Sequence, residues 1–228
     1  MKKLLLFDID GTLLTAGSAS NRFVGVINRV HGIDVVPSKD FAGYTDFLIL
    51  ASLLEDEGWS DDQIKAAMPK LIDELDKLHE ETFIAKDIHL LPGVKELLDA
   101  LREADCALGL ITGNLETIAK RKLETLGIWD YFSIGGYGSD PHVSRGDLVT
   151  IAVKLAGFEN HIEDVFVIGD TPRDIEAAHA AGVTNSIGVA NGFRSIDELS
   201  NAGAKFVFEN FKDTDQVMSA FGLVNKSN

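Results

Sequence analysis

The sequence is poor in cysteine, in positive charge and in long apolar runs, and each shortage excludes a class of protein. Cys106 is the one cysteine among 228 residues, so no internal disulfide can form and a reducing, cytoplasmic setting is expected. Lysine and arginine number 21 against 36 acidic residues, and the net charge of −15 argues against nucleic acid or an anionic membrane as partner. No apolar stretch approaches the roughly 20 residues that span a bilayer.

Two kinds of catalytic motif are also missing. Cys106 lies in the apolar stretch 106–111 without an accompanying His or Asn motif, which predicts a buried structural thiol instead of a nucleophile. The first apolar run, residues 4–7, is not followed by the Gly-x-Gly-x-x-Gly turn that nicotinamide-dependent oxidoreductases require. Neither a thiol enzyme nor an oxidoreductase of that kind is therefore expected.

Short apolar runs alternate with helical patterns along most of the chain. The runs that read as strands cover residues 4–7, 107–111, 131–134, 164–168, 186–189 and 205–208. Strand alternating with helix is typical of a parallel sheet with helical crossovers. The sequence therefore predicts an α/β fold, a Rossmann-like parallel sheet flanked by helices.

One long segment departs from this alternation. Between residues 16 and 87 the apolar residues recur at spacings of three and four, and no clear strand pattern occurs. We expect this segment to form an α-helical cap inserted after the first strand. The predicted catalytic core then consists of residues 1–15 and 88–228, and the predicted cap of residues 16–87.

Polar residues that carry chemistry gather just after the predicted strands. The four clusters are Asp8-Ile9-Asp10-Gly11-Thr12, Thr112-Gly113-Asn114, the neighbourhood of Arg145, and Gly169-Asp170-Thr171-Pro172-Arg173-Asp174. Open α/β sheets bind their ligands at the carboxyl ends of the strands. If the strands are neighbours, the four clusters converge on one crevice.

The residue types in these clusters suit phosphoryl transfer. Asp8, Asp10 and Asp170 are hard oxygen ligands of the kind that Mg²⁺ prefers. Thr112 and the backbone amides after it, at a helix start, form an anion cradle, and Arg145 supplies a permanent positive charge. Positioning and charge stabilisation are the main requirements of phosphoryl transfer.

The same clusters resemble the motifs of the haloacid dehalogenase-like superfamily. Asp8-Ile9-Asp10-Gly11-Thr12-Leu13 is similar to the first motif, Thr112 to the second, and Gly169-Asp170 with Asp174 to the fourth. The helical insertion resembles the type-1 cap of the branch that contains phosphoglycolate phosphatases and beta-phosphoglucomutases. The resemblance covers essentially the whole chain.

The resemblance implies a role for each acid of the first and fourth motifs. Asp8 would attack phosphorus and form an aspartyl phosphate, and Asp10 would protonate the leaving oxygen and then accept a proton from water. Asp8 and Asp170, with the backbone carbonyl of Asp10, would hold Mg²⁺, and Asp174 would bind the ion directly or through one of its ligands. Asp10 must then be protonated near neutral pH, which the charge of Asp8 favours and Mg²⁺ opposes.

Phosphate contacts are expected from the remaining motif residues. Thr112, Gly113 and Asn114 would bind phosphoryl oxygens, and Gly11 with Thr12 would let the backbone approach the phosphate closely. The third motif departs from the common pattern, since Pro141-His142-Val143-Ser144-Arg145 contains no lysine. We assign the charge-neutralising role to Arg145; a surface ion pair of Arg145 with Asp147, or a role for His142, are the alternatives.

In the cap, the turn Gly43-Tyr44-Thr45-Asp46 is the candidate for substrate contacts through Thr45 and Asp46. A helix cap with a packed Tyr44 is the alternative interpretation of this turn.

Together these features predict a Mg²⁺-dependent phosphatase acting on a small phosphorylated metabolite. A phosphomutase of sugar phosphates and a non-catalytic phospholigand-binding regulatory protein are the alternatives. The acid at Asp10 favours cleavage of a P–O bond over dehalogenation, because a halide leaves without a proton.

Overall fold

The core of the protein is a six-stranded, wholly parallel sheet. The computed structural model describes residues 2–15, 20–139, 144–191 and 194–223. The strands are β1 (Lys3–Phe7), β2 (Cys106–Thr112), β3 (Ile134–Tyr137), β4 (Val165–Gly169), β5 (Asn185–Val189) and β6 (Phe206–Phe208). They lie in the order β3-β2-β1-β4-β5-β6, which confirms the predicted Rossmann-like fold class.

The strand order brings the predicted motifs to one edge of the sheet. β1 lies between β2 and β4, so the chain switches sides of the sheet at β1. Phe7 at the end of β1 is level with Leu110 and Ile168. The residues that follow each of these three positions therefore emerge side by side, at the place where open α/β sheets bind ligands.

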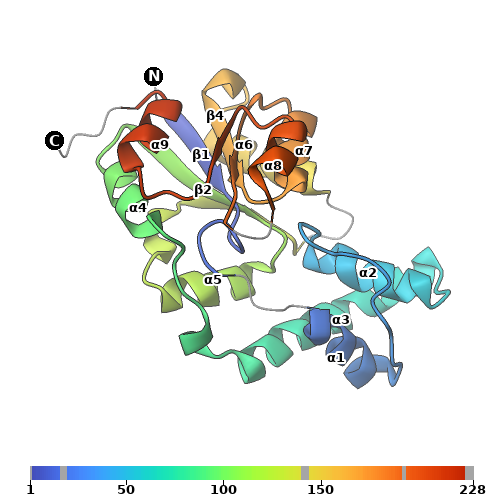
Figure 1. Ribbon diagram of the computed structural model, residues 1–228. Helices are drawn as coiled ribbons and strands as arrows, with labels where there is room; N and C mark the ends of the chain where they lie inside the picture. The colour runs from blue at the N-terminus through green and yellow to red at the C-terminus, as the bar shows by residue number, and fades with distance from the viewer. Residues whose placement is uncertain (1, 16–19, 140–143, 192–193, 224–228) are drawn as a thin grey trace.

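Helices cover both faces of the sheet (Figure 1). They are α4 (Val94–Arg102), α5 (Glu116–Thr125), α6 (Arg145–Ala156), α7 (Pro172–Ala180), α8 (Ile196–Asn201) and α9 (Thr214–Ala220), with 3-10 turns η1 (Ala85–Asp87), η2 (Trp129–Tyr131) and η3 (Ile162–Asp164). Leu5 and Phe7 pack on one side, with residues of α4, α5 and α9. Leu4 and Leu6 pack on the other, with residues of α6 and α7. Burial on both faces explains the uninterrupted apolar run of β1.

The third strand lies later in the chain than predicted. The sequence predicts a strand over residues 131–134 and a glycine-rich loop over 135–141, whereas β3 is Ile134–Tyr137. Gly136 pairs with Ile111, and a Cβ at Gly136 would lie 2.3 Å from the carbonyl oxygen of Leu148 in α6. The glycine lets α6 pack closely on the sheet, so glycine marks a close approach here and not a turn.

Three helices form a separate lobe with an apolar core of its own. They are α1 (Ser20–His31), α2 (Asp46–Asp56) and α3 (Asp61–Thr82), and they lie beside the sheet domain in Figure 1. Pro69 lies inside α3, which continues through it. Leu115 and Ile118 from the start of α5 belong to the same apolar cluster, so this lobe rests on α5. We call it the cap; its predicted first residue, 16, lies outside the described residues, and the predicted boundaries stay a prediction. Among the residues described, no helix is long and apolar enough to cross a membrane.

Candidate active site

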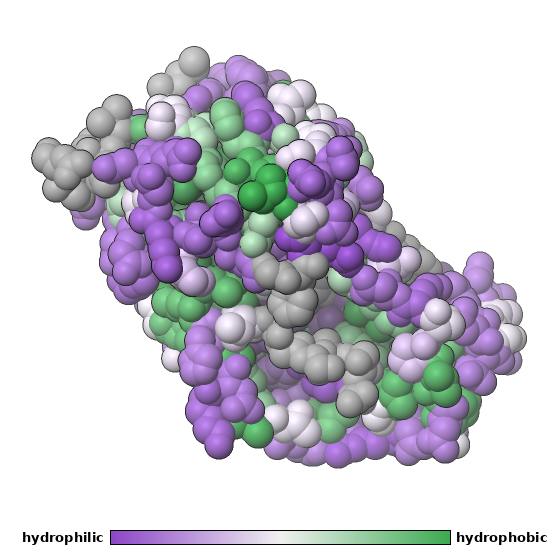
Figure 2. Space-filling model, in the orientation of Figure 1, coloured by the Kyte–Doolittle hydropathy of each residue, from purple (hydrophilic) through white to green (hydrophobic). Residues whose placement is uncertain are grey.

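A cleft of about 1100 Å³ lies between the cap and the carboxyl edge of the sheet. In the space-filling view the surface is hollowed between the two lobes (Figure 2). Eight of the predicted site residues line this cleft: Asp8, Asp10, Asp46, Thr112, Gly113, Asn114, Arg145 and Asp170. The structure therefore brings together residues from all four of the predicted clusters.

Arg145 bridges two of the acids. It opens α6, where the side chain of Ser144 caps the helix. Its Nη2 donates to Asp8 Oδ1 at 2.6 Å and also to Asp174 Oδ1, which in addition accepts from Nε at 2.8 Å. Asp147 accepts hydrogen bonds from Ser144 instead, so the alternative surface pair of Arg145 with Asp147 does not form. His142 lies outside the described residues.

Asp8, Asp170 and Asp174 form a compact group of buried carboxylates. One oxygen from each lies within 4.8 Å of the others. The pKa of Asp8 is raised, because burial and the charge of Asp174 outweigh the opposing charge of Arg145. The pKa of Asp170 is also raised, by burial and by the charge of Asp8. One guanidinium thus faces three acids, and the local charge remains negative unless a proton or a cation is added.

This group fits a divalent cation. The Oδ1 atom of Asp170 is buried and has no hydrogen-bond partner within the described part of the chain. A buried carboxylate oxygen without a partner is costly, and a hard cation satisfies it. Asp8 and Asp170 are accordingly suited to Mg²⁺. The oxygens of Asp174 are occupied by Arg145 and by Thr171, whose N–H and Oγ1 donate at 3.0 and 2.7 Å. Asp174 therefore holds Arg145 in place beside the cation position.

Asp10 lies outside this group and is paired with Lys122. The ammonium of Lys122 lies 2.8 Å from Asp10 Oδ1, 2.7 Å from Oδ2 and 2.9 Å from the Oδ1 of Asn114. Burial tends to raise the pKa of Asp10, but the charge and hydrogen bonds of Lys122 outweigh it, and the pKa is lowered. Asp10 is thus held as a carboxylate, whereas its predicted role as an acid requires a proton.

Lys122 is the residue that the sequence analysis missed. Lys122 lies in α5, on the same buried face of the helix as Ile118, Ala119 and Leu123. A lysine within the apolar stripe of a helix is a detectable signal, because a buried ammonium needs an acidic partner. The sequence does not reveal which acid that partner is.

The predicted anion cradle is partly filled by the protein itself. Thr112 Oγ1 accepts from the backbone N–H of Asn114 at 3.2 Å and from its Nδ2 at 2.8 Å. The N–H of Leu115 donates to Asp46 Oδ2 at 3.0 Å. The side chain of Asn114 also donates to Asp10, so its amide orients the carboxylate of Asp10. Phosphate binding by Thr112, Gly113 and Asn114 stays a prediction.

The first-motif turn approaches the acids closely. Gly11 adopts φ +86°, and a Cβ there would lie 2.2 Å from Asp170 Oδ2, so only glycine fits. Thr12 is fully buried, and its Oγ1 has no hydrogen-bond partner within the described segments. The close approach that Gly11 allows is to an acid, and the expected approach of Gly11 and Thr12 to phosphate stays a prediction.

The cap turn that carries Thr45 and Asp46 docks onto the core. Thr45 caps α2 by accepting from Leu48 N–H, as the alternative interpretation expected. The N–H of Asp46 donates to the carbonyl of Gly113 at 2.7 Å, and its carboxylate binds the start of α5. Burial, against the opposing hydrogen bond from Leu115, raises the pKa of Asp46 to about 6. The Thr45 hydroxyl and Asp46 Oδ2 are thus engaged within the protein. Asp46 also lines the cleft, and substrate binding by the two residues stays a prediction.

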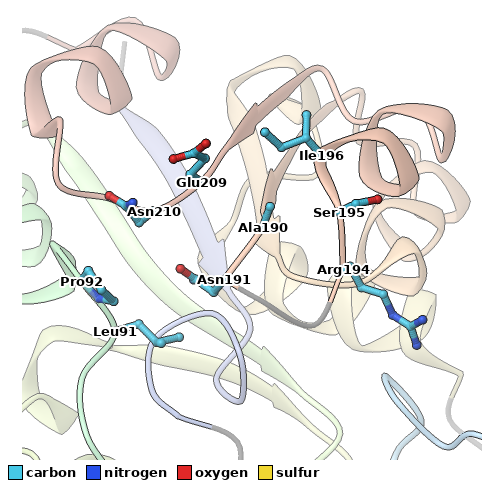
Figure 3. Close-up of a pocket in the computed structure, with 9 residues that line it drawn as sticks. All are labelled: Leu91, Pro92, Ala190, Asn191, Arg194, Ser195, Ile196, Glu209 and Asn210. Carbon is cyan, nitrogen blue, oxygen red and sulfur yellow. The ribbon is translucent and has the colours of Figure 1, made fainter.

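A second, more open groove of about 570 Å³ lies on the core beside the cleft (Figure 3). It holds one acid, Glu209, and one cation, Arg194. Figure 3 shows the Arg194 side chain extending away from the groove, and its Nη2 lies 2.6 Å from Asp40 of the cap. The groove lacks converging acids, so the candidate active site is the cleft.

The fold and the site define a haloacid dehalogenase-like enzyme. The family described as Haloacid dehalogenase-like hydrolase matches residues 5–189, and the chain belongs to that family. This confirms the predicted family and the prediction of an enzyme of hydrolase class.

Similar proteins include phosphatases. A phosphoglycolate phosphatase of Vibrio vulnificus is 29% identical over 217 residues, which cover 90% of this chain and 91% of that protein. A hydrolase of Pseudomonas syringae is similar in structure, with a TM-score of 0.71, 25% identity, and coverage of 96% and 98% of the two chains. A beta-phosphoglucomutase of Clostridium difficile has a TM-score of 0.72 at 18% identity, covering 97% and 98%, and shows the shared fold.

Proposed function

We propose that the protein is a Mg²⁺-dependent phosphatase that hydrolyses a small phosphorylated metabolite through a phosphate ester of Asp8. The observation that carries the proposal is the placement of Asp8 at the cleft. Its carboxylate accepts from Arg145 at 2.6 Å and lies beside Asp170, whose Oδ1 has no partner among the described residues. Membership of the hydrolase family and the named phosphatase relatives support the same activity.

The proposed reaction has two steps. An oxygen of Asp8 forms a bond to phosphorus while the bond from phosphorus to the leaving oxygen breaks. Asp10, which must first take up a proton against the effect of Lys122 on its pKa, gives that proton to the leaving oxygen. A water molecule then attacks the phosphorus, Asp10 takes the proton of the water, and the bond from Asp8 to phosphorus breaks. Phosphate is released, and both acids regain their starting state.

Charge at the phosphoryl group is balanced by residues around Asp8. Arg145, held by Asp174, places a guanidinium next to the nucleophile, where it attracts the phosphoryl oxygens. Mg²⁺ held by Asp8 and Asp170, with the backbone carbonyl of Asp10, would supply further positive charge. The cap covers the cleft, which restricts water and selects the leaving group.

The proposed compartment is the cytoplasm. Cys106 is half-buried, and its Sγ donates to the carbonyl of Leu101. Burial raises the pKa of its thiol to about 11, so little thiolate forms at neutral pH. A protein whose one thiol is protected in this way suits a reducing environment.

A panel of phosphate monoesters tests the proposal. The purified protein with Mg²⁺ is incubated with 4-nitrophenyl phosphate, 2-phosphoglycolate and sugar phosphates, and free phosphate is measured with and without a chelator. We expect phosphate release that the chelator abolishes. Isomerised sugar phosphate in the presence of a sugar bisphosphate would indicate a mutase, and binding without turnover of any ester would indicate a regulatory protein.

A further inference from the structure

The cap wall of the cleft carries a cation, Arg22, whose side chain has no ion-pair partner among the described residues. Five cationic side chains line the cleft: Arg22, Lys39, Lys122, Arg145 and Arg194. The last three are paired with Asp10, Asp8 and Asp40 respectively. Lys39 is exposed and lies over the ring of Phe41. Arg22, in the first turn of α1, is half-buried and makes no ion pair or hydrogen bond with the described residues.

Arg22 lies within electrostatic reach of Asp10, the acid to which we assign the proton transfers, and of His79. Its charge helps to lower the pKa of both side chains. Asp10 is already neutralised by Lys122. The guanidinium of Arg22 is therefore left available to an anion that enters the cleft from solution.

His79 provides a neutral donor in the same cleft as Arg22. It is buried in α3, lines the cleft and stacks on Phe83 with ring centroids 5.2 Å apart. Its Nδ1 lies 3.0 Å from Nη1 of Arg121. A guanidinium only donates hydrogen bonds, so Nδ1 is the acceptor and the ring proton of the neutral imidazole is on Nε2.

The surroundings of His79 keep it neutral. Burial, followed by the charges of Arg22, Lys122 and Arg121, lowers the pKa of His79 to about 3. The Nε2–H group makes no hydrogen bond within the described part of the chain. Arg121 itself is held by Asp76 at 3.2 Å, which fixes the ring orientation. His79 thus presents one N–H donor of fixed orientation.

We infer that Arg22 and His79 form a subsite for a second anionic group of the substrate, on the part of the molecule that leaves with the oxygen. This inference rests on the proposed phosphatase function and names its substrate class: phosphate monoesters that carry a further carboxylate or phosphate. The guanidinium supplies a charged fork and the imidazole a neutral donor, a combination that carboxylate and phosphate oxygens both accept. Phosphate monoesters whose alkyl group carries no charge leave the subsite empty.

The test compares three esters in the full-length enzyme with Mg²⁺. Two carry a second anion, 2-phosphoglycolate and ethane-1,2-diyl bisphosphate, and the third, ethyl phosphate, does not. The measured quantity is the ratio of kcat/KM for each anionic ester to kcat/KM for ethyl phosphate. We expect the wild-type enzyme to prefer at least one anionic ester, and Arg22→Met to reduce that preference by roughly ten- to a hundredfold, the usual value of a charge-assisted hydrogen bond.

Controls separate recognition from folding. Arg29 lies in the same helix as Arg22 and forms ion pairs with Glu74 and Glu81 outside the cleft. The kcat/KM ratio of Arg29→Met should therefore equal that of the wild type. Arg22→Lys should restore part of the preference, and His79→Gln should lower it without abolishing it. The thermal unfolding midpoint of each variant shows whether it is folded.

Each outcome decides one question. A fall in the ratio for 2-phosphoglycolate alone supports a carboxylate subsite, and a fall for the bisphosphate alone supports a phosphate subsite. A wild-type enzyme without preference, or Arg22→Met with an unchanged ratio, overturns the subsite while leaving the phosphatase intact. Absence of hydrolysis of all three esters and of 4-nitrophenyl phosphate overturns the proposed function itself.

Discussion

The ammonium group of Lys122 lies between the two carboxylate oxygens of Asp10, at 2.8 and 2.7 Å. Asn114 joins the two side chains, since it donates to Asp10 through Nδ2 and accepts from Lys122 through Oδ1. Asp10 comes from the turn after β1, Asn114 from the turn after β2, and Lys122 from α5. Their hydrogen bonds fix the orientation of the acid to which we assign the proton transfers.

Replacing Lys122 removes the hydrogen bonds that orient Asp10, and we expect this loss of orientation to outweigh the rise in the pKa of Asp10 that follows from losing the charge of Lys122. In Lys122→Met we expect turnover of ethyl phosphate to fall by roughly a hundredfold or more, the usual contribution of general acid–base catalysis. Turnover of 4-nitrophenyl phosphate should fall much less, because 4-nitrophenolate leaves without being protonated. The difference is measured by kcat/KM for both esters, which reports the transfer of the phosphoryl group to Asp8 and not the later attack of water that the two esters share.

The matched control for this variant is Lys120→Met, which removes an exposed lysine of the same helix that pairs with Glu124. Equal losses for the alkyl and the aryl ester in Lys122→Met would show that Lys122 acts on the fold of the site and not on proton transfer.

Arg145 should be needed for both stability and turnover. Arg145→Met leaves the buried acids Asp8 and Asp174 without their cation, and we expect about 3–5 kcal/mol less free energy of unfolding in the metal-free protein. Arg145→Lys keeps the charge but loses the fork that binds both acids, and should retain part of the stability and of kcat. Chemical denaturation and phosphate release measure the two effects.

Lys154→Met, at an exposed position near the end of the same helix, is the control for the Arg145 variants. An Arg145→Met protein with wild-type stability and turnover would be inconsistent with the bridging role.

Asp46 should make stability depend on pH at the junction of cap and core. Its pKa is raised to about 6 in the folded protein from an ordinary value of 3.8, mainly by burial. An acid with a raised pKa stabilises the fold while it is protonated, and this contribution is lost as the pH rises through 6. Asp46→Asn keeps an acceptor for the Leu115 N–H and does not ionise.

The free energy of unfolding of wild type minus that of Asp46→Asn should fall by about 2–3 kcal/mol between pH 4 and pH 7 and then stay constant. Denaturant titrations across this range measure it, with Asp62→Asn, at an exposed position in the first turn of α3, as the matched control. A flat difference would mean that Asp46 ionises as freely in the folded protein as in the unfolded one.

The sequence contained most of what places the acids at the site. Asp8 and Asp170 directly follow apolar runs, and in a parallel sheet neighbouring strand ends share an edge, so their meeting follows from the pattern. Arg145 could be assigned because it opens a helix next to that edge. By contrast, β3 was placed three residues too early, because glycines that serve close packing look like a loop.

Contacts between distant segments could not be predicted in the same way. The pairing of Lys122 with Asp10 and the docking of Asp46 on α5 join residues 112 and 69 positions apart. Periodicity shows that Lys122 lies on a buried stripe, but not which segment that stripe faces. Such partners depend on how the cap and the helices pack, which local pattern does not encode.

The role of Asp8 as nucleophile is tested most directly by trapping its phosphate ester. The wild-type protein and Asp8→Asn are mixed with a rapidly hydrolysed phosphate monoester and Mg²⁺, quenched in acid and digested. The mass of the peptide that contains residue 8 is then measured by mass spectrometry. We predict a phosphorylated Asp8 peptide in the wild type. The folded Asp8→Asn variant should give neither this peptide nor free phosphate. Retained turnover in Asp8→Asn would contradict the account.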